Sequence, residues 1–109
     1  MSLKLDPDNN FVMNSTYLKF ILLGSSQSGV TKVVEVRSKR NEHHSLGRIE
    51  WFAPWRKYCF KPANGTVFDV DCLRDLQAFL LLLNDQHKEE VASRKRMGPA
   101  SASTIRMLD

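Results

Sequence analysis

Apolar and polar residues alternate in short runs over the first part of the chain, with turn-forming residues between the runs. Alternation with a period of two, rich in β-branched and aromatic residues, is typical of half-buried strands. It predicts four strands at residues 17–23, 30–37, 46–52 and 56–61. Glycine and serine at 24–29 suit a hairpin loop, and Pro54 breaks the chain before the fourth strand. With no helix between them, the strands should form an antiparallel meander.

A helical period replaces this alternation from Asp69 to about residue 88. Asp69 is placed to cap the helix, and Phe68 and Leu73 to form a hydrophobic staple around the cap. One stripe of the helix is apolar and should cover the apolar face of the sheet; its members are Cys72, Leu73, Leu76, Phe79, Leu80 and Leu83. Leu81 and Leu82 point away from this stripe, either as scattered surface leucines or as an interface with a second copy or another protein.

Length and composition limit the architecture to one small α+β domain. The chain has 109 residues, of which 42% are hydrophobic and 26% charged. We expect a flexible leader at 1–15, a single domain at 16–92 and a disordered basic tail at 93–109. No apolar run has the length of a membrane span and the N-terminus lacks a signal-peptide pattern, which predicts a cytoplasmic protein whose two cysteines, Cys59 and Cys72, are reduced.

The net charge of +4 is concentrated in the middle of the chain. Between residues 30 and 61, eight lysines and arginines oppose three glutamates, so an acidic partner should meet this region. Trp55, Arg56 and Lys57 lie at the predicted bend and, with Leu81 and Leu82, are candidate contacts to a protein partner. The alternative is weak nucleic-acid binding, in which basic strands contact phosphates; its candidate residues are Arg37, Lys39, Arg40, Arg56 and Lys57.

The chain contains residue types used in catalysis and in cofactor and metal binding, but they do not have the spacing that such motifs require. The loop from Gly24 to Lys32 lacks a lysine directly after its second glycine and leads into a strand, unlike a phosphate-binding loop. His43 and His44 have no partner at metal-ligand spacing and receive no role. We therefore expect a non-enzymatic protein without cofactor or metal.

The region around the bend resembles a group of small uncharacterised proteins encoded in bacteriophage and prophage genomes. The resemblance runs over residues 46–84 and is carried by LGRIEWFAPWRKYCFKP at 46–62, TVF at 66–68 and CLRDLQAF at 72–79. It implies a phage-borne gene whose product has an accessory role inside an infected or lysogenic bacterium. We expect the protein to act by binding a host or phage protein. It transfers no catalytic or binding residue.

Overall fold

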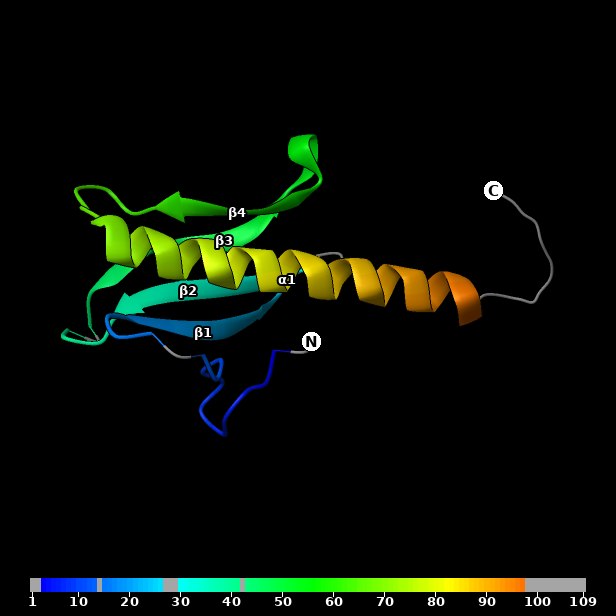
Figure 1. The fold of residues 1–109 in the computed structure, drawn as a ribbon, viewed down its shortest axis with the longest axis horizontal. Coiled ribbons are helices and arrows are strands. Elements are labelled where there is room, and N and C mark those ends of the chain that lie inside the picture. Colours follow the sequence, from blue (N-terminus) through cyan, green and yellow to red (C-terminus); the bar gives the residue numbers. More distant parts are fainter. Residues whose placement is uncertain (1–2, 14, 27–29, 42, 98–109) are drawn as a thin grey trace.

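The computed structural model describes residues 3–13, 15–26, 30–41 and 43–97. Four strands, β1 (Leu18–Ser25), β2 (Lys32–Ser38), β3 (Ser45–Phe52) and β4 (Lys57–Pro62), form one antiparallel sheet in the order β1-β2-β3-β4. A 3₁₀ turn, η1 (Ala53–Trp55), joins β3 to β4, and the helix α1 (Val70–Met97) follows. The helix crosses one face of the sheet and extends beyond it (Figure 1). The predicted α+β fold, a meander with one long helix, is confirmed.

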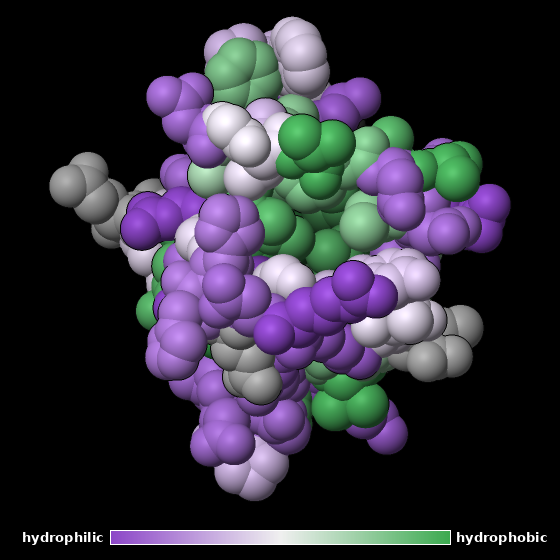
Figure 2. All heavy atoms as spheres, turned by 90° about the vertical axis from the view of Figure 1, so that its left-hand side faces the viewer, coloured by the Kyte–Doolittle hydropathy of each residue, from purple (hydrophilic) through white to green (hydrophobic). Residues whose placement is uncertain are grey.

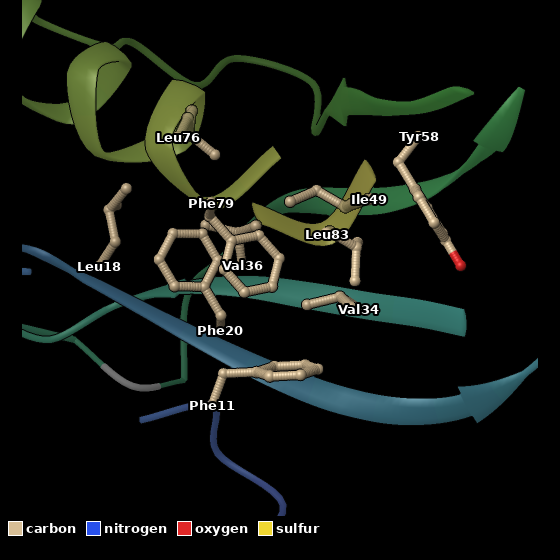
Figure 3. Packing of buried hydrophobic residues seen from close by; sticks show 10 residues of the cluster. All are labelled: Phe11, Leu18, Phe20, Val34, Val36, Ile49, Tyr58, Leu76, Phe79 and Leu83. Carbon is tan, nitrogen blue, oxygen red and sulfur yellow. The ribbon is translucent and has the colours of Figure 1, made fainter. Parts of the chain in front are cut away.

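The core lies between the inner face of the sheet and α1. Its strand residues are those that the alternation placed on one face: Leu18, Phe20, Val34, Val36, Ile49 and Tyr58. The helix contributes Leu76, Phe79 and Leu83 (Figure 3). Phe79 stacks on Phe20 with ring centroids 4.1 Å apart and planes 6° from parallel. Removal of these apolar side chains from water holds the helix on the sheet.

The start of α1 agrees with the prediction at its cap, whereas Leu73 is more exposed than predicted. The Asp69 carboxylate accepts the backbone N–H of Cys72 at 2.9 Å, so Asp69 is the N-cap. This bond favours the charged form and lowers the pKa of Asp69. Leu73, expected in the buried stripe, is 52% exposed. Phe68, the other residue of the predicted staple, packs edge-on against Phe60 of β4.

The helix also continues beyond its predicted end. It runs to Met97 rather than to about residue 88, so residues 93–97 are helical where we expected the start of a disordered tail. Arginine, lysine and methionine are all good helix formers, which explains a helix here without an apolar period. Residues 98–109 of the expected tail lie outside the described residues.

Residues 3–13, expected within the flexible leader, pack along the outer edge of β1. The backbone N–H of Phe11 donates to the carbonyl of Phe20, and that of Leu22 donates to the carbonyl of Asn9, both at 2.8 Å. Phe11 is 7% exposed, and its ring meets Phe79 edge-on with centroids 5.1 Å apart (Figure 3). The leader prediction is therefore wrong for this segment, because it is tied to the sheet and contributes to the core.

Polar contacts fix where α1 lies along the sheet. Near its start, the Ser15 hydroxyl donates to the Asp75 carboxylate at 2.6 Å. Near its end, Lys32 of β2 forms an ion pair with Glu90 at 3.4 Å. Within the described ranges, no helix combines the length and the apolar character needed to cross a membrane.

Candidate functional site

The corner between β3 and β4 projects from the sheet at the top of Figure 1. Pro54 lies in the first turn of η1, where its missing N–H costs no helical hydrogen bond. The turn ends at Arg56, which adopts a left-handed conformation with φ 53° and donates its N–H to the carbonyl of Ala53. Trp55 is 65% exposed and contacts Phe52 edge-on, with centroids 4.9 Å apart. The chain thus presents Trp55 and Arg56 side by side in solvent.

A groove runs between this corner and the middle of α1. We call it the corner groove; it has a volume of about 310 Å³ and is lined by Trp51, Arg56, Lys57, Leu81, Asn84, Asp85, His87 and Lys88. The hollow continues along the helix to Val91 and Ala92. It is therefore elongated, and both the sheet corner and the helix contribute walls.

Aromatic rings form the floor of the corner groove. The centroid of the Trp51 indole lies 4.4 Å from that of the His87 ring and 5.3 Å from that of the Tyr58 ring, which the indole meets edge-on. Tyr58 is 2% exposed, and its hydroxyl accepts the backbone N–H of Lys32 at 3.0 Å. Burial disfavours the phenolate and raises the pKa of Tyr58. The floor is held from below by packed and hydrogen-bonded groups.

Asn84 connects the two walls of the groove. Its side-chain oxygen accepts the backbone N–H of Tyr58 at 2.8 Å. Its amide nitrogen donates to the carbonyl of Leu80 at 3.0 Å and lies 3.5 Å from that of Tyr58. Since β4 is an edge strand, this amide takes the place of a neighbouring strand at Tyr58. The separation of helix and corner is thereby fixed.

Three cations surround the aromatic floor. Arg56, Lys57 and Lys88 are exposed and form no salt bridge with any residue that the structure describes. Asp85 is the one carboxylate in the described lining. Leu81 is 57% exposed and supplies apolar surface beside the indole. The groove therefore combines a rigid ring, an exposed aliphatic side chain and an excess of positive charge.

The structure brings together three of the five residues predicted to contact a protein partner. Arg56, Lys57 and Leu81 line the corner groove, and Trp55 stands on the adjoining corner. Leu82 is half-buried and does not line the groove. One helical step of 100° separates it from Leu81, so the two leucines face different surroundings.

The five cations predicted for nucleic-acid binding are divided between opposite ends of the sheet. Arg37, Lys39 and Arg40 lie at the end of β2, whereas Arg56 and Lys57 lie where β4 begins. Arg37 already forms an ion pair with Glu35 at 2.6 Å. The Lys39 ammonium donates to the carbonyl of Ser15. These five side chains do not form one surface.

Sequence reasoning missed the contributions of Trp51, His87 and Lys88 to the groove. Trp51 packs against the core, and its indole also forms the groove floor. Lys88 follows Leu81 by seven residues and so lies on the same helix face. This seven-residue spacing could have identified Lys88 from the sequence as a neighbour of Leu81.

A second hollow, of about 570 Å³, lies at the N-terminal end of α1. Figure 2 shows this end of the molecule, with an apolar depression bordered by hydrophilic side chains. Leu18, Leu46 and Cys72 line it, and burial raises the pKa of the Cys72 thiol. A raised pKa opposes the thiolate form that nucleophilic cysteines require. Asp69, on its border, is engaged as the helix cap.

Metal-binding residue types are dispersed. Among the described residues, no three histidine, cysteine, aspartate or glutamate side chains cluster in a way that could hold a metal ion. His43 and His44 are both exposed. Cys59 and Cys72 are free thiols, one on β4 and the other on α1.

Comparison with known proteins gives one informative similarity. The chain is 28% identical over 78 residues to an uncharacterised 9.3 kDa protein of Acholeplasma phage L2, covering 72% of this chain and 97% of the phage protein. No family model matches the chain, and no solved structure does. The expected resemblance to small phage-encoded proteins is thus confirmed, and it extends well beyond residues 46–84.

Proposed function

We propose that this chain is a non-enzymatic binding protein that holds an acidic segment of a host or phage protein in the corner groove. The observation that carries the proposal is the convergence of three cations without salt bridges among the described residues on the floor formed by Trp51 and His87. In the biological setting that the phage similarity suggests, it acts as an accessory factor in the cytoplasm of an infected bacterium.

The chemistry of the groove favours a peptide segment with one apolar anchor. Binding energy at protein interfaces concentrates in tryptophan, tyrosine and arginine side chains that lie in preformed pockets. Trp51 and Arg56 meet that description, and Leu81 adds apolar contact area. Carboxylates of the partner would lie against Arg56, Lys57 and Lys88, and the elongated hollow accommodates an extended chain toward Val91.

Intrinsic fluorescence offers a direct test, because the chain contains two tryptophans. A Trp55→Phe variant leaves Trp51 as the sole indole and keeps an aromatic ring at the corner. Titration with acidic peptides that carry a single leucine or phenylalanine should change the Trp51 emission in a saturable way. Peptides with the same anchor and lysines in place of the acids should leave it unchanged, since they meet a cationic groove.

Charge reversal then identifies the binding surface. Arg56→Glu with Lys88→Glu should abolish the emission change and the retention of acidic proteins from nuclease-treated bacterial lysate. The matched control is Lys4→Glu with Arg74→Glu, which makes the same change in net charge at exposed positions outside the groove. Equal binding by both double variants would refute the corner groove as the docking site.

A further inference from the structure

The outer face of the sheet, turned away from α1, carries a second concentration of positive charge. The alternation that buries the inner face directs the neighbouring residues of each strand to the outer face. Lys57, at the start of β4 and opposite Phe52, is at one of these positions and also lines the corner groove. The other charged residues there are the cations Lys19, Arg37, Arg48 and Lys61 and the carboxylates Glu35 and Glu50. No second helix or sheet is present in the described ranges to cover this face. Apart from Lys57, none of these charged residues lines the corner groove.

The register of the strands places like charges opposite each other. Lys19 of β1 is paired with Arg37 of β2, and Arg48 of β3 is paired with Lys61 of β4. Directly opposed like charges on neighbouring strands destabilise a sheet. Arg48 and Lys61 are both exposed, and neither forms a salt bridge within the described part of the chain. Arg48 is also opposite Glu35 of β2, but that carboxylate already forms an ion pair with Arg37. An anion bound across the two strands would reverse this repulsion.

An exposed aromatic group lies at the end of the same path. Arg48, Glu50 and Phe52 are successive outward positions of β3, at intervals of about 6.6 Å. Phe52 contacts the exposed Trp55 indole edge-on. The outer face thus presents cations followed by an indole that is free to receive a stacked ring on its exposed side.

We propose that this outer face binds single-stranded nucleic acid, with phosphates at Arg48 and Lys61 and a base stacked on Trp55. Non-specific single-strand sites combine such a cationic path with aromatic rings, because every base offers a face for stacking. Four strands spaced about 4.8 Å apart make a surface wider than the roughly 12 Å major groove of a duplex. The sheet is therefore too wide to enter the major groove of a duplex, whereas a single strand of nucleic acid can lie across its face.

The salt dependence of binding gives a quantitative test. The probe is a labelled oligothymidylate, followed by fluorescence anisotropy at several salt concentrations. If all four cations contact phosphates, the slope of log affinity against log salt should be about −2.8. Arg48→Gln with Lys61→Gln should reduce the slope to about −1.4 and the affinity in 0.1 M salt by about 25-fold. Trp55→Ala should weaken binding by roughly 10- to 100-fold through the loss of stacking.

Matched controls separate this site from general attraction to positive charge. Lys4→Gln with Arg74→Gln removes the same charge elsewhere and should leave the slope unchanged. The Arg48→Gln and Lys61→Gln variant should unfold at the same or a higher denaturant concentration than the unmodified protein, because it removes a repulsive pair. A lower midpoint would contradict the repulsion on which the proposal rests.

Three further results would overturn the proposal. One is the absence of oligothymidylate binding at low salt. Another is a salt dependence that the Arg48→Gln, Lys61→Gln variant and the Lys4→Gln, Arg74→Gln control weaken equally. The third is binding of polyglutamate or of duplex DNA that is equal or tighter and is weakened by Arg48→Gln with Lys61→Gln, which would assign the face to an acidic protein or to a double-stranded ligand. Polyglutamate binding that this variant leaves unchanged belongs to the corner groove and leaves the expected single-strand preference to be read from duplex DNA. Preference for the single strand, together with sensitivity to Arg48, Lys61 and Trp55, is the result expected.

Discussion

Tyr58 contributes to the core and to the sheet, and it contacts the groove floor from below, through different parts of one side chain. Its ring is buried and supports the edge of the Trp51 indole. Its hydroxyl accepts a backbone hydrogen bond from Lys32, at the start of β2. Burial raises the pKa of the phenol, and the nearby Glu90 carboxylate acts in the same direction. The folded protein therefore prefers the neutral phenol more strongly than the unfolded chain does.

This preference predicts a loss of stability in alkali. The unfolded tyrosine has a pKa of about 10, and the folded value lies above it. The contribution of Tyr58 to stability is thus complete below pH 10 and is lost as the pH rises from there through the folded pKa. Urea unfolding as a function of pH should show this decline. Tyr58→Phe should lessen it, while lowering stability below pH 10 because the Lys32 N–H loses its acceptor.

The control for the pH experiment is Tyr17→Phe, which removes the other tyrosyl hydroxyl of the chain. This variant should retain the alkaline decline of the unmodified protein. If the decline has the same steepness in the unmodified protein and in Tyr58→Phe, another group is responsible for it.

At Arg56, local stability and the proposed function make opposite demands on a single residue. A left-handed conformation costs a non-glycine residue about 1–2 kcal/mol, and Arg56 adopts it at the corner. Glycine would remove that strain, but it would also remove a cation from the groove. The presence of arginine at this position is understandable if its side chain contacts a partner.

At the scale of elements, Asn84 joins the middle of α1 to the free edge of β4. It binds the backbone of Tyr58 and a carbonyl of its own helix. Few side chains offer an acceptor and a donor on one short, planar group. The register between helix and edge strand therefore depends on an amide at this position.

Asn84→Ala should lower the free energy of unfolding by about 1–3 kcal/mol, because it leaves polar backbone groups at the edge of β4 without their partner. Gln77→Ala is the control, since it removes a side-chain amide from an exposed position of the same helix. Chemical denaturation measures both. Equal midpoints for the two variants would mean that the Asn84 contacts contribute nothing to stability.

The elements were predictable where a local pattern determines them. Alternation located the strands within about two residues, and the acceptor oxygen of Asp69 located the start of α1. The end of α1 was not predictable from an apolar period, because its last turns extend beyond the sheet in Figure 1 and need none. The corner groove was predicted in part: the exposed Arg56 and Lys57 follow from the bend, whereas the dual role of Trp51 depends on where His87 lies in space.

At the scale of the whole molecule, the N-terminal segment and α1 complete the sheet from different sides. Residues 9–11 of the N-terminal segment pair with the free edge of β1, while Asn84 occupies part of the free edge of β4. Both edges of the sheet are thereby limited in their ability to pair with other chains. Phe79 lies where these parts meet, with Phe20 of β1 on one side and Phe11 of the N-terminal segment on another (Figure 3).

This arrangement predicts that the domain does not begin at residue 16. Phe11→Ala should lower the free energy of unfolding by about 3–5 kcal/mol, because it opens a cavity beside Phe79. Val12→Ala is the adjacent control: its side chain is 65% exposed, so its loss should change stability by less than about 0.5 kcal/mol. The free energy of unfolding of a small domain is only about 5–15 kcal/mol. The Phe11 variant should therefore lose a large share of its stability. Matching urea midpoints for the two variants would show instead that the N-terminal segment is dispensable to the fold.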